Sequence, residues 1–445
     1  MPNMYKSVKT LQKGPKLSEV RQAFRLHGVN AWSHLQAQHG DHFMFQGIWV
    51  CSDPEWVEKL LMQKVHTRER SRLYKKSQKL IPLANGMLFM DGEDWQKRLQ
   101  AVMPAFTKQE VEEYATTMLD HLELSWAVWG EGVCEDVYAH IIELNKKHLF
   151  HAGYGLDLQN QAVETWANRL IEYKFMRMDQ RHRVDFFGIG WKELGALART
   201  LRHTPKLRRL EKQIQQDMVA LHNQDLYKAK GKGIDWYWRL KKAAFTDTQI
   251  AQELNHLYSA YNALDYALTC AMIELAKEPK WQEAIRNEWN TIKQEGFTME
   301  RYKSMKSLSN FCKEVLRYYP VTMGVSRKTG EEIQLGDRRI KAGQEVLILL
   351  YPLHYHPDYW DNPHDFNPDR WEQGPKHPAA YIPFLKGSRH CIGRHLAELN
   401  MALVVASAIE HFHISLHGEV PSLNQFMMPR FDYPVSLKFE VLEAE

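Results

Sequence analysis

The hydrophobic period of this 445-residue chain changes beyond Pro320, and this change constrains the fold more than any other feature. Between about residues 93 and 320 the apolar residues recur with the period of a helix, and Pro320 ends the last helix, in the segment LSNFCKEVLRYYP. After it, EEIQLGDRRI predicts a hairpin that turns at Gly336 and Asp337, and residues 346–351 predict a buried strand. We therefore expect a mainly α fold with a small β region in the C-terminal third.

Other segments predict the order of the remaining elements. Residues 31–62 predict a helix, one short strand (HFMFQGIWVCS) and a second helix that begins at Pro54. The longest predicted helix covers residues 251–279, where Pro279 ends it. The helix predicted for residues 394–412 is apolar on nearly all sides, so we expect it at the centre of the molecule. A short strand, VSLKFEV, is predicted near the end of the chain.

Composition narrows the class of protein. The chain is 44 % apolar and 25 % charged, as in an ordinary soluble protein, and a net charge of +4 gives no reason to expect nucleic acid as a partner. Five widely spaced cysteines match neither a disulfide framework nor a zinc pattern, which favours a reducing compartment. There is no signal-like segment and no apolar run of the ~18 residues that a membrane span needs. We expect a cytoplasmic monomer without an integral membrane segment, with one domain at residues 21–445 after an N-terminal extension at 1–20.

The segment FLKGSRHCIG places Cys391 where a thiolate would be stable. Arg389 and Arg394 lie on either side of Cys391, at the start of a helix whose amide groups favour an anion. Gly387 allows a tight turn, and Gly393 leaves room for a flat, bulky group close to the backbone. A lone cysteine is typically a buried small hydrophobe, but these neighbours favour a thiolate.

Two further polar groups are ambiguous when each is read alone. Glu314 and Arg317 are three residues apart on one helix, which is typical of a solvated ion pair. Arg370 follows a turn in FNPDRW. Two arginines and a glutamate can form a bidentate network, but the sequence does not show that they meet.

Taken together, these segments resemble the cytochrome P-450 family. Phe384-x-x-Gly-x-Arg-x-Cys-x-Gly resembles its haem-binding loop, Glu314-x-x-Arg317 its K-helix motif, and the FNPDRW segment its meander arginine. DGEDWQKRLQAVMPAF resembles its C-helix, with Trp95 at the tryptophan position. The resemblance is strong over about residues 300–440 and extends back to about residue 30.

The resemblance implies a single haem-thiolate domain that binds haem b (iron protoporphyrin IX), with Cys391 as the axial ligand of the iron. It implies that Glu314, Arg317 and Arg370 form an ion network that supports the haem loop. It also assigns Arg327 and Trp95 to the haem propionates. The expected cofactor-binding residues are Cys391, Arg389, Arg327, Trp95, Arg98, Phe384, Gly387 and Gly393. Expected partners are a small organic substrate, dioxygen and a separate electron-donor chain of the ferredoxin or flavodoxin type.

The chain departs from the family on the long helix at 251–279. Members usually carry an acid followed by threonine there, which deliver protons to dioxygen. The alignment puts Asn262 and Ala263 at these positions, so an amide replaces the acid and a methyl replaces the hydroxyl. A rival register would put Asp265 and Tyr266 there, again without threonine. Arg98 also lies three residues after Trp95, where the family usually has its basic residue four after.

Three functional hypotheses follow for the chemistry. The chain is a monooxygenase of a mostly apolar, aromatic or hydroxylated substrate in secondary metabolism, with protons brought by the substrate or a water. Alternatively it performs non-insertion chemistry, such as phenol coupling, peroxide use or rearrangement. A haem-thiolate sensor without turnover is the competing class. The expected substrate pocket includes Tyr258, Ser259, Tyr266 and Val321.

Overall fold

The computed structural model describes residues 12–62, 86–181, 194–224, 236–336, 338–424, 430–431 and 433–442. The chain is mostly helical with a small strand region, which confirms the expected fold class. It divides into two compact units. Unit 1 comprises residues 1–79, 306–394 and 419–435, and unit 2 comprises residues 80–305, 395–418 and 436–445.

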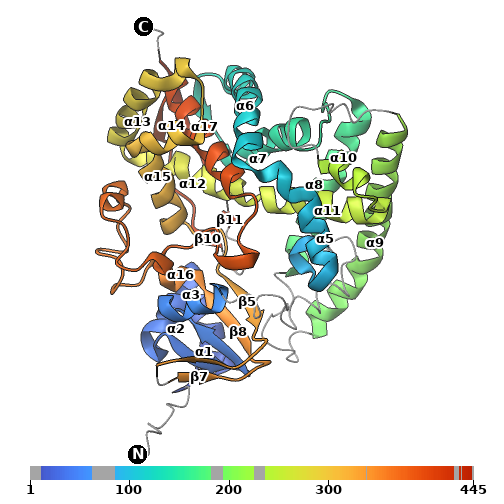
Figure 1. Ribbon diagram of the computed structural model, residues 1–445. Helices are drawn as coiled ribbons and strands as arrows, with labels where there is room; N and C mark the ends of the chain where they lie inside the picture. The colour runs from blue at the N-terminus through green and yellow to red at the C-terminus, as the bar shows by residue number, and fades with distance from the viewer. Residues whose placement is uncertain are drawn as a thin grey trace, which may run out of the picture. The chain divides into compact units, whose positions relative to one another are not determined.

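Unit 1 is built around a five-stranded sheet with the strand order β1-β2-β3-β8-β5. Its strands are β1 (Gln12–Lys13), β2 (His42–Phe45), β3 (Ile48–Cys51), β5 (Gly324–Lys328) and β8 (Glu345–Leu349). β3 pairs with β8 in parallel, so blue strands from the N-terminus and orange strands from the C-terminal third share one sheet (Figure 1). Two small hairpins complete the strands of the unit, namely β6 (Ile333–Leu335) with β7 (Arg338–Ile340) and β10 (Leu423–Asn424) with β11 (Arg430–Phe431).

The described helices of unit 1 are α1 (Leu17–His27), α2 (Ala31–His39), α3 (Pro54–Met62), α15 (Lys306–Tyr318) and α16 (Leu350–His354). Of these, α3 and α16 bury an apolar core against this sheet. Trp56, Val57 and Leu60 of α3 pack in one buried cluster with Trp49 of β3 and Ile348 of β8. The burial of these large side chains, each worth about 1.5–3 kcal/mol, fixes α3 on the sheet.

The strand predicted for HFMFQGIWVCS is a hairpin, and the prediction of one strand was wrong. β2 and β3 pair antiparallel, with Phe45 opposite Ile48. The two-residue turn between them has positive φ at both positions, 50° at Gln46 and 78° at Gly47. Turns of this kind match the twist of the flanking strands, and the Gln-Gly pair was the signal that the sequence offered.

Unit 2 is almost wholly helical. Its helices are α5 (Gly92–Val102), α6 (Lys108–Trp129), α7 (Val137–His148), α8 (Gln161–Arg181), α9 (Leu194–Asn223), α10 (Trp236–Lys242), α11 (Asp247–Tyr261), α12 (Ala263–Lys277), α13 (Pro279–Ile292), α14 (Met299–Ser304) and α17 (Arg394–His411). One sheet of three strands belongs to it, with the order β4 (Gly132–Cys134), β12 (Leu437–Val441) and β9 (Phe412–Leu416). α17 is buried along most of its length, as its apolar sequence predicted.

The long helix predicted at residues 251–279 is two helices. α11 ends at Tyr261, Asn262 lies in a turn, and α12 begins at Ala263 (Figure 1). α12 ends at Lys277, just before Pro279, as predicted, and Pro279 also starts α13, because proline fits the first helical position, where no amide donor is needed. The break therefore falls at the position where the sequence departs from the family.

Two other predictions of elements are confirmed. α15 ends at Tyr318, before Pro320. The hairpin predicted at Gly336 and Asp337 is present, with Ile333 opposite Ile340, although Asp337 itself lies outside the described residues. Within the described residues, no helix is long and apolar enough to cross a membrane.

Candidate functional site

A short loop in unit 1 carries Cys391. The loop turns at Leu385 and Gly387, whose φ angles are +60° and +75°, and passes through a 3-10 turn at Gly387–Arg389. The backbone amide of Cys391 donates a hydrogen bond to the carbonyl of Phe384 at 2.8 Å, which closes the loop. The side chain of Cys391 is exposed, and the cysteine is in no disulfide. The loop thus presents a thiol on a rigid backbone.

The end of α3 fixes this loop from beside it. A Cβ atom added to Gly387 would lie 1.8 Å from the carbonyl oxygen of Leu61, so only glycine fits there. Lys386 donates to the carboxylate of Glu58 on α3 at 3.0 Å. The sequence indicated Gly387 through its motif, but the contact with α3 carried no sequence signal.

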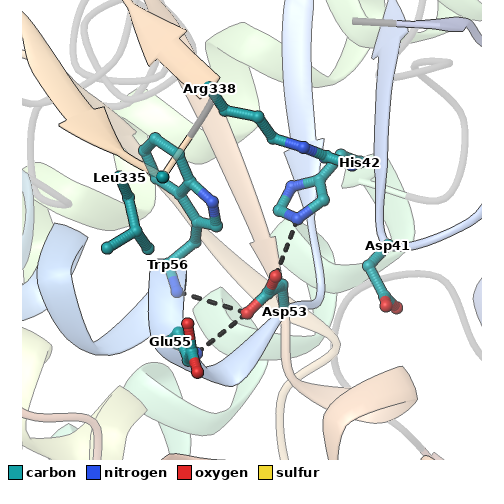
Figure 2. Close-up of a pocket in the computed structure, with 8 residues that line it drawn as sticks. Asp41, His42, Asp53, Glu55, Trp56, Leu335 and Arg338 are labelled. Carbon is teal, nitrogen blue, oxygen red and sulfur yellow. Dashed lines mark hydrogen bonds and ion pairs between the residues drawn. The ribbon is translucent and has the colours of Figure 1, made fainter. Parts of the chain in front are cut away.

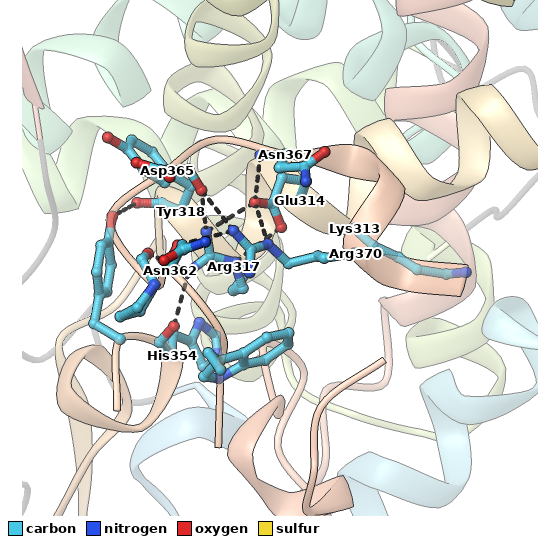
Figure 3. Close-up of polar contacts among 12 residues, drawn as sticks. Lys313, Glu314, Arg317, Tyr318, His354, Asn362, Asp365, Asn367 and Arg370 are labelled. Atoms are coloured by element: carbon cyan, nitrogen blue, oxygen red, sulfur yellow. Dashed lines mark hydrogen bonds and ion pairs between the residues drawn. The ribbon is translucent and has the colours of Figure 1, made fainter. Parts of the chain in front are cut away.

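An ion network joins residues from three parts of unit 1 (Figure 3). Arg317 binds Glu314 through two parallel hydrogen bonds of 2.8 Å, and both side chains are fully buried. Arg370 donates to the same carboxylate at 2.9 Å. The structure therefore brings together the three residues that the sequence singled out separately, in the bidentate geometry typical of strong ion pairs.

The remaining N–H groups of Arg317 and the indole N–H of Trp371 bind backbone carbonyls and the network's own carboxylate. Arg317 also donates to the carbonyls of His354, Pro363 and Asp365, at 2.8–3.0 Å. Trp371 donates its indole N–H to Glu314 at 3.0 Å. Sequence reasoning missed Trp371, although it directly follows Arg370. Because the buried charges are fully hydrogen-bonded, they fix the positions of the backbone segments that they bind.

The C-helix candidates lie on α5 in unit 2. Trp95 and Arg98 are both buried there. Arg98 donates to the buried carboxylate of Glu253 on α11 at 2.6 Å and to Gln252 at 3.1 Å. Sequence analysis did not identify this partner, which is 155 residues away.

At the break between α11 and α12, Asn262 turns its side chain back on the preceding helix. Its Nδ2 atom donates to the backbone carbonyl of Tyr258 at 2.7 Å. A carbonyl only accepts, so the atom that faces it must be the amide nitrogen, and the Oδ1 atom of Asn262 faces the other way as an acceptor. Asn262 and Ala263 are both half-buried.

The other pocket candidates lie in different places. Tyr258 and Tyr266 are buried in unit 2, and burial raises the pKa of Tyr258 well above its usual value. Ser259 is half-buried and donates to the carbonyl of Asn255 at 2.8 Å. Val321 is half-buried in unit 1. Their shared role in a substrate pocket stays a prediction.

A polar cavity of about 360 Å³ lies elsewhere in unit 1 (Figure 2). Its acids are occupied locally, since Asp53 accepts from the amides at the start of α3 and pairs with His42 at 2.9 Å. Asp41 accepts from Gln36 and Ser52 and pairs with His356. None of the predicted cofactor-binding, network or substrate-pocket residues lines this cavity.

Comparisons with known proteins decide the family. The family model for cytochrome P450 matches residues 29–437. The chain belongs to the cytochrome P450 family. It is therefore an oxidoreductase of the monooxygenase class, and the cofactor of this P450 is haem.

Its relatives are distant. The chain is 24 % identical to cytochrome P450 4X1 of Mus musculus, over 83 % of this chain and 77 % of that protein. It is 25 % identical to cytochrome P450 734A5 of Oryza sativa subsp. japonica, over 87 % of this chain and 76 % of that protein. The solved structure of the retinoic acid bound cyanobacterial CYP120A1 superposes with a TM-score of 0.76 at 19 % identity, covering 97 % of this chain and 100 % of that chain. This last likeness shows the P450 fold.

The residues of unit 1 fit a haem. Cys391 presents an exposed thiol, which is the ligand type that P450 iron uses. Arg327 and Arg389 are 3 % and 6 % exposed. The Nε atom of Arg327 and the Nη1 atom of Arg389 are buried without a hydrogen-bond partner in the described part of the chain, although both arginines have other contacts. Buried guanidinium donors of this kind suit the carboxylates of a propionate-bearing group.

Proposed function

We propose that Cys391 is the axial thiolate of this P450 and that its substrate is a small, mostly apolar molecule carrying a hydroxyl or another hydrogen-bond donor. When bound, the haem supplies the activation of dioxygen. Arg389, Arg327 and Trp95 would hold the propionates, while Phe384 would shield the sulfur from water. The network of Glu314, Arg317 and Arg370 would keep the loop in the geometry that presents the thiol.

The orientation of Asn262 is the observation that supports this substrate class. Its Nδ2 atom donates one of its two hydrogens to the Tyr258 carbonyl, so the Oδ1 atom of Asn262 remains as an acceptor, and an amide supplies no acid. Ala263 offers only a methyl group. Protons must then come from the substrate or from a water that Asn262 orients, and a substrate with an O–H or N–H group would satisfy the Oδ1 atom.

Non-insertion chemistry is the second candidate, because the missing hydroxyl at Ala263 also suits it. In phenol coupling or desaturation the substrate itself supplies the protons. Peroxide-dependent turnover would likewise need no proton relay on this helix. We expect a separate ferredoxin or flavodoxin-type donor for the dioxygen-dependent reaction. The cytoplasmic location, the monomeric state and the role in secondary metabolism stay predictions.

The ligand assignment is tested with the reduced carbon monoxide complex. The wild type should show the Soret band of a thiolate-ligated haem, and Cys391→His should replace it with the band of an imidazole-ligated haem. Cys312→Ala is the matched control, because Cys312 is buried in α15. An unchanged spectrum in Cys391→His would exclude the assignment.

The substrate class is tested with pairs of aromatic compounds that differ by one hydroxyl. Hydroxylated members should bind tighter, as measured by the shift in iron spin state, and Asn262→Leu should remove about 1–3 kcal/mol of that preference. Turnover is then compared between reduced ferredoxin and peroxide. Equal turnover with peroxide, unchanged in Ala263→Thr, would favour the second candidate. Compounds that shift the spin state but are never consumed would indicate a sensor.

A further inference from the structure

A buried chain of hydrogen bonds holds the last residue of α11, next to the helix break. The Tyr261 hydroxyl accepts from the Nδ2 atom of Asn400 on α17 at 2.7 Å and is hydrogen-bonded to the hydroxyl of Tyr114 on α6. Tyr114 donates to the backbone carbonyl of His148 on α7 at 2.9 Å. All four residues are buried. This series of hydrogen bonds ends in a side-chain amide and a backbone carbonyl, and neither group passes protons on. The series therefore acts as a tether.

A second contact holds the other side of the break. The carboxylate of Asp265, in the first turn of α12, accepts from the Nδ2 atom of Asn145 on α7 at 2.7 Å. Asp265 and Asn145 are also buried. The two helix ends that meet at Asn262 are therefore fixed separately, each by side chains of neighbouring helices.

Stability alone does not explain the amide of Asn400. This residue is fully buried at the start of the apolar run of α17, and its Oδ1 atom has no hydrogen-bond partner among the described residues. A buried acceptor left unpaired costs about 1–3 kcal/mol, roughly what a buried hydrogen bond returns. Leucine at this position would avoid that cost, so the amide is explained better by what it holds.

We propose that the tether of Asn400, Tyr261 and Tyr114 sets the geometry of the break between α11 and α12 and thereby positions Asn262. The role given to Asn262 rests on the proposed function, whereas the tether itself does not. α17 begins three residues after Cys391 in the chain. The tether thus connects the helix that follows the proposed thiolate with the end of α11, next to Asn262, and Tyr261 and Asn400 are positioning residues.

The test compares Tyr261→Phe and Asn400→Leu with Tyr154→Phe in the haem-loaded protein. Tyr154 is a matched control because it is also buried and donates its hydroxyl to α11, at the carbonyl of Leu254, away from the break. The first readout is amide hydrogen exchange of the peptide covering residues 258–264. Loss of one tether hydrogen bond should speed this exchange about tenfold in Tyr261→Phe and Asn400→Leu. Tyr154→Phe should leave it unchanged.

The second readout is the C–O stretching band of the reduced carbon monoxide complex, which reports the polar groups near the bound gas. We expect the band to shift in Tyr261→Phe and Asn400→Leu as it does in Asn262→Leu, and to stay in place in Tyr154→Phe. Unchanged exchange at residues 258–264 in both tether variants would overturn the proposal. If Asn262→Leu does not shift the C–O stretching band, the role proposed for Asn262 is refuted. The amide hydrogen exchange at residues 258–264 still decides whether the tether exists.

Discussion

Gly387 shows how a single residue of this P450 depends on a distant segment. Its φ of +75° disfavours any residue with a Cβ atom, and that atom would also collide with the carbonyl of Leu61. The two effects are separable, because Gly374 has a similar φ of +72° with nothing within 4 Å of the added Cβ. The close approach of α3, in addition to the turn, makes glycine necessary in the haem loop.

We expect Gly387→Ala to lower the free energy of unfolding by about 3 kcal/mol or more, since backbone atoms must move to admit the methyl group. Gly374→Ala should lower it by about 1–2 kcal/mol, the cost of the left-handed conformation alone. Urea unfolding measures both, and the Soret band of the reduced carbon monoxide complex reports the loop. Equal losses in the two variants would contradict the role given to Leu61.

At this scale the sequence predicts positions better than partners. The spacing around Cys391 predicted a tight loop, and the structure has one. The contacts of Gly387 with Leu61 and of Arg98 with Glu253 join residues far apart in the chain, and nothing in local spacing indicates them. The sequence could place Arg98 on a helix, but its resemblance-based role as a propionate contact stays a prediction.

Among the elements, α5 and α11 are joined by the ion pair of Arg98 and Glu253. Both side chains are buried, and Glu253 is also 3.3 Å from the Nδ1 atom of His256. Removing one member of a buried pair leaves the other charge without compensation. The pair therefore joins the helix of Trp95 to the helix that leads to Asn262.

Glu253→Gln should lower the free energy of unfolding by about 3 kcal/mol, because the charge of Arg98 stays buried. The double variant Arg98→Met with Glu253→Leu should lose less free energy of unfolding than Arg98→Met and Glu253→Leu lose together as single variants. Urea unfolding measures each, with Glu440→Gln as a control in an exposed pair with Lys438, where we expect no change. Strictly additive losses would show that the pair is not coupled.

The break between α11 and α12 shows why element boundaries were harder to predict than element types. The segment SAYNALD contains neither proline nor glycine, so its helical period continues across Asn262. The break is accompanied by tertiary contacts of Tyr261 and Asp265 with α17 and α7, and these are invisible in a local pattern. The same period correctly predicted α15 and α17, where no such contact interrupts the helix.

For the molecule as a whole, two buried histidines, one in each unit, contribute to the response to acid. Burial lowers the pKa of His148 to about 3, helped by nearby His121, and burial with nearby Arg317 lowers the pKa of His354 to about 3. Both are neutral in the folded protein, whereas the unfolded chain protonates them near their ordinary pKa of 6.5. Between these pH values the unfolded state binds more protons than the folded state. The contribution of the two histidines to the free energy of unfolding is therefore fully present above pH 6.5 and decreases as the pH is lowered toward 3.

Each histidine should contribute a slope of about 1.4 kcal/mol per pH unit in this window. Urea unfolding at a series of pH values between 7 and 4.5 measures the combined slope. His148→Phe should flatten this slope, because it removes one of the two rings that are buried neutral. A stability that does not change between pH 7 and 4.5 in the wild type would contradict the neutral burial of both rings.

The parallel pairing of β3 with β8 has a consequence for how the protein is made. During translation Ile48–Cys51 is made almost three hundred residues before its partner strand. In unit 2, β4 likewise pairs with β12, which is made about three hundred residues later. The strands made first must therefore be kept from pairing with the wrong edges until their partners have been made. We expect this chain to depend on chaperones during its synthesis.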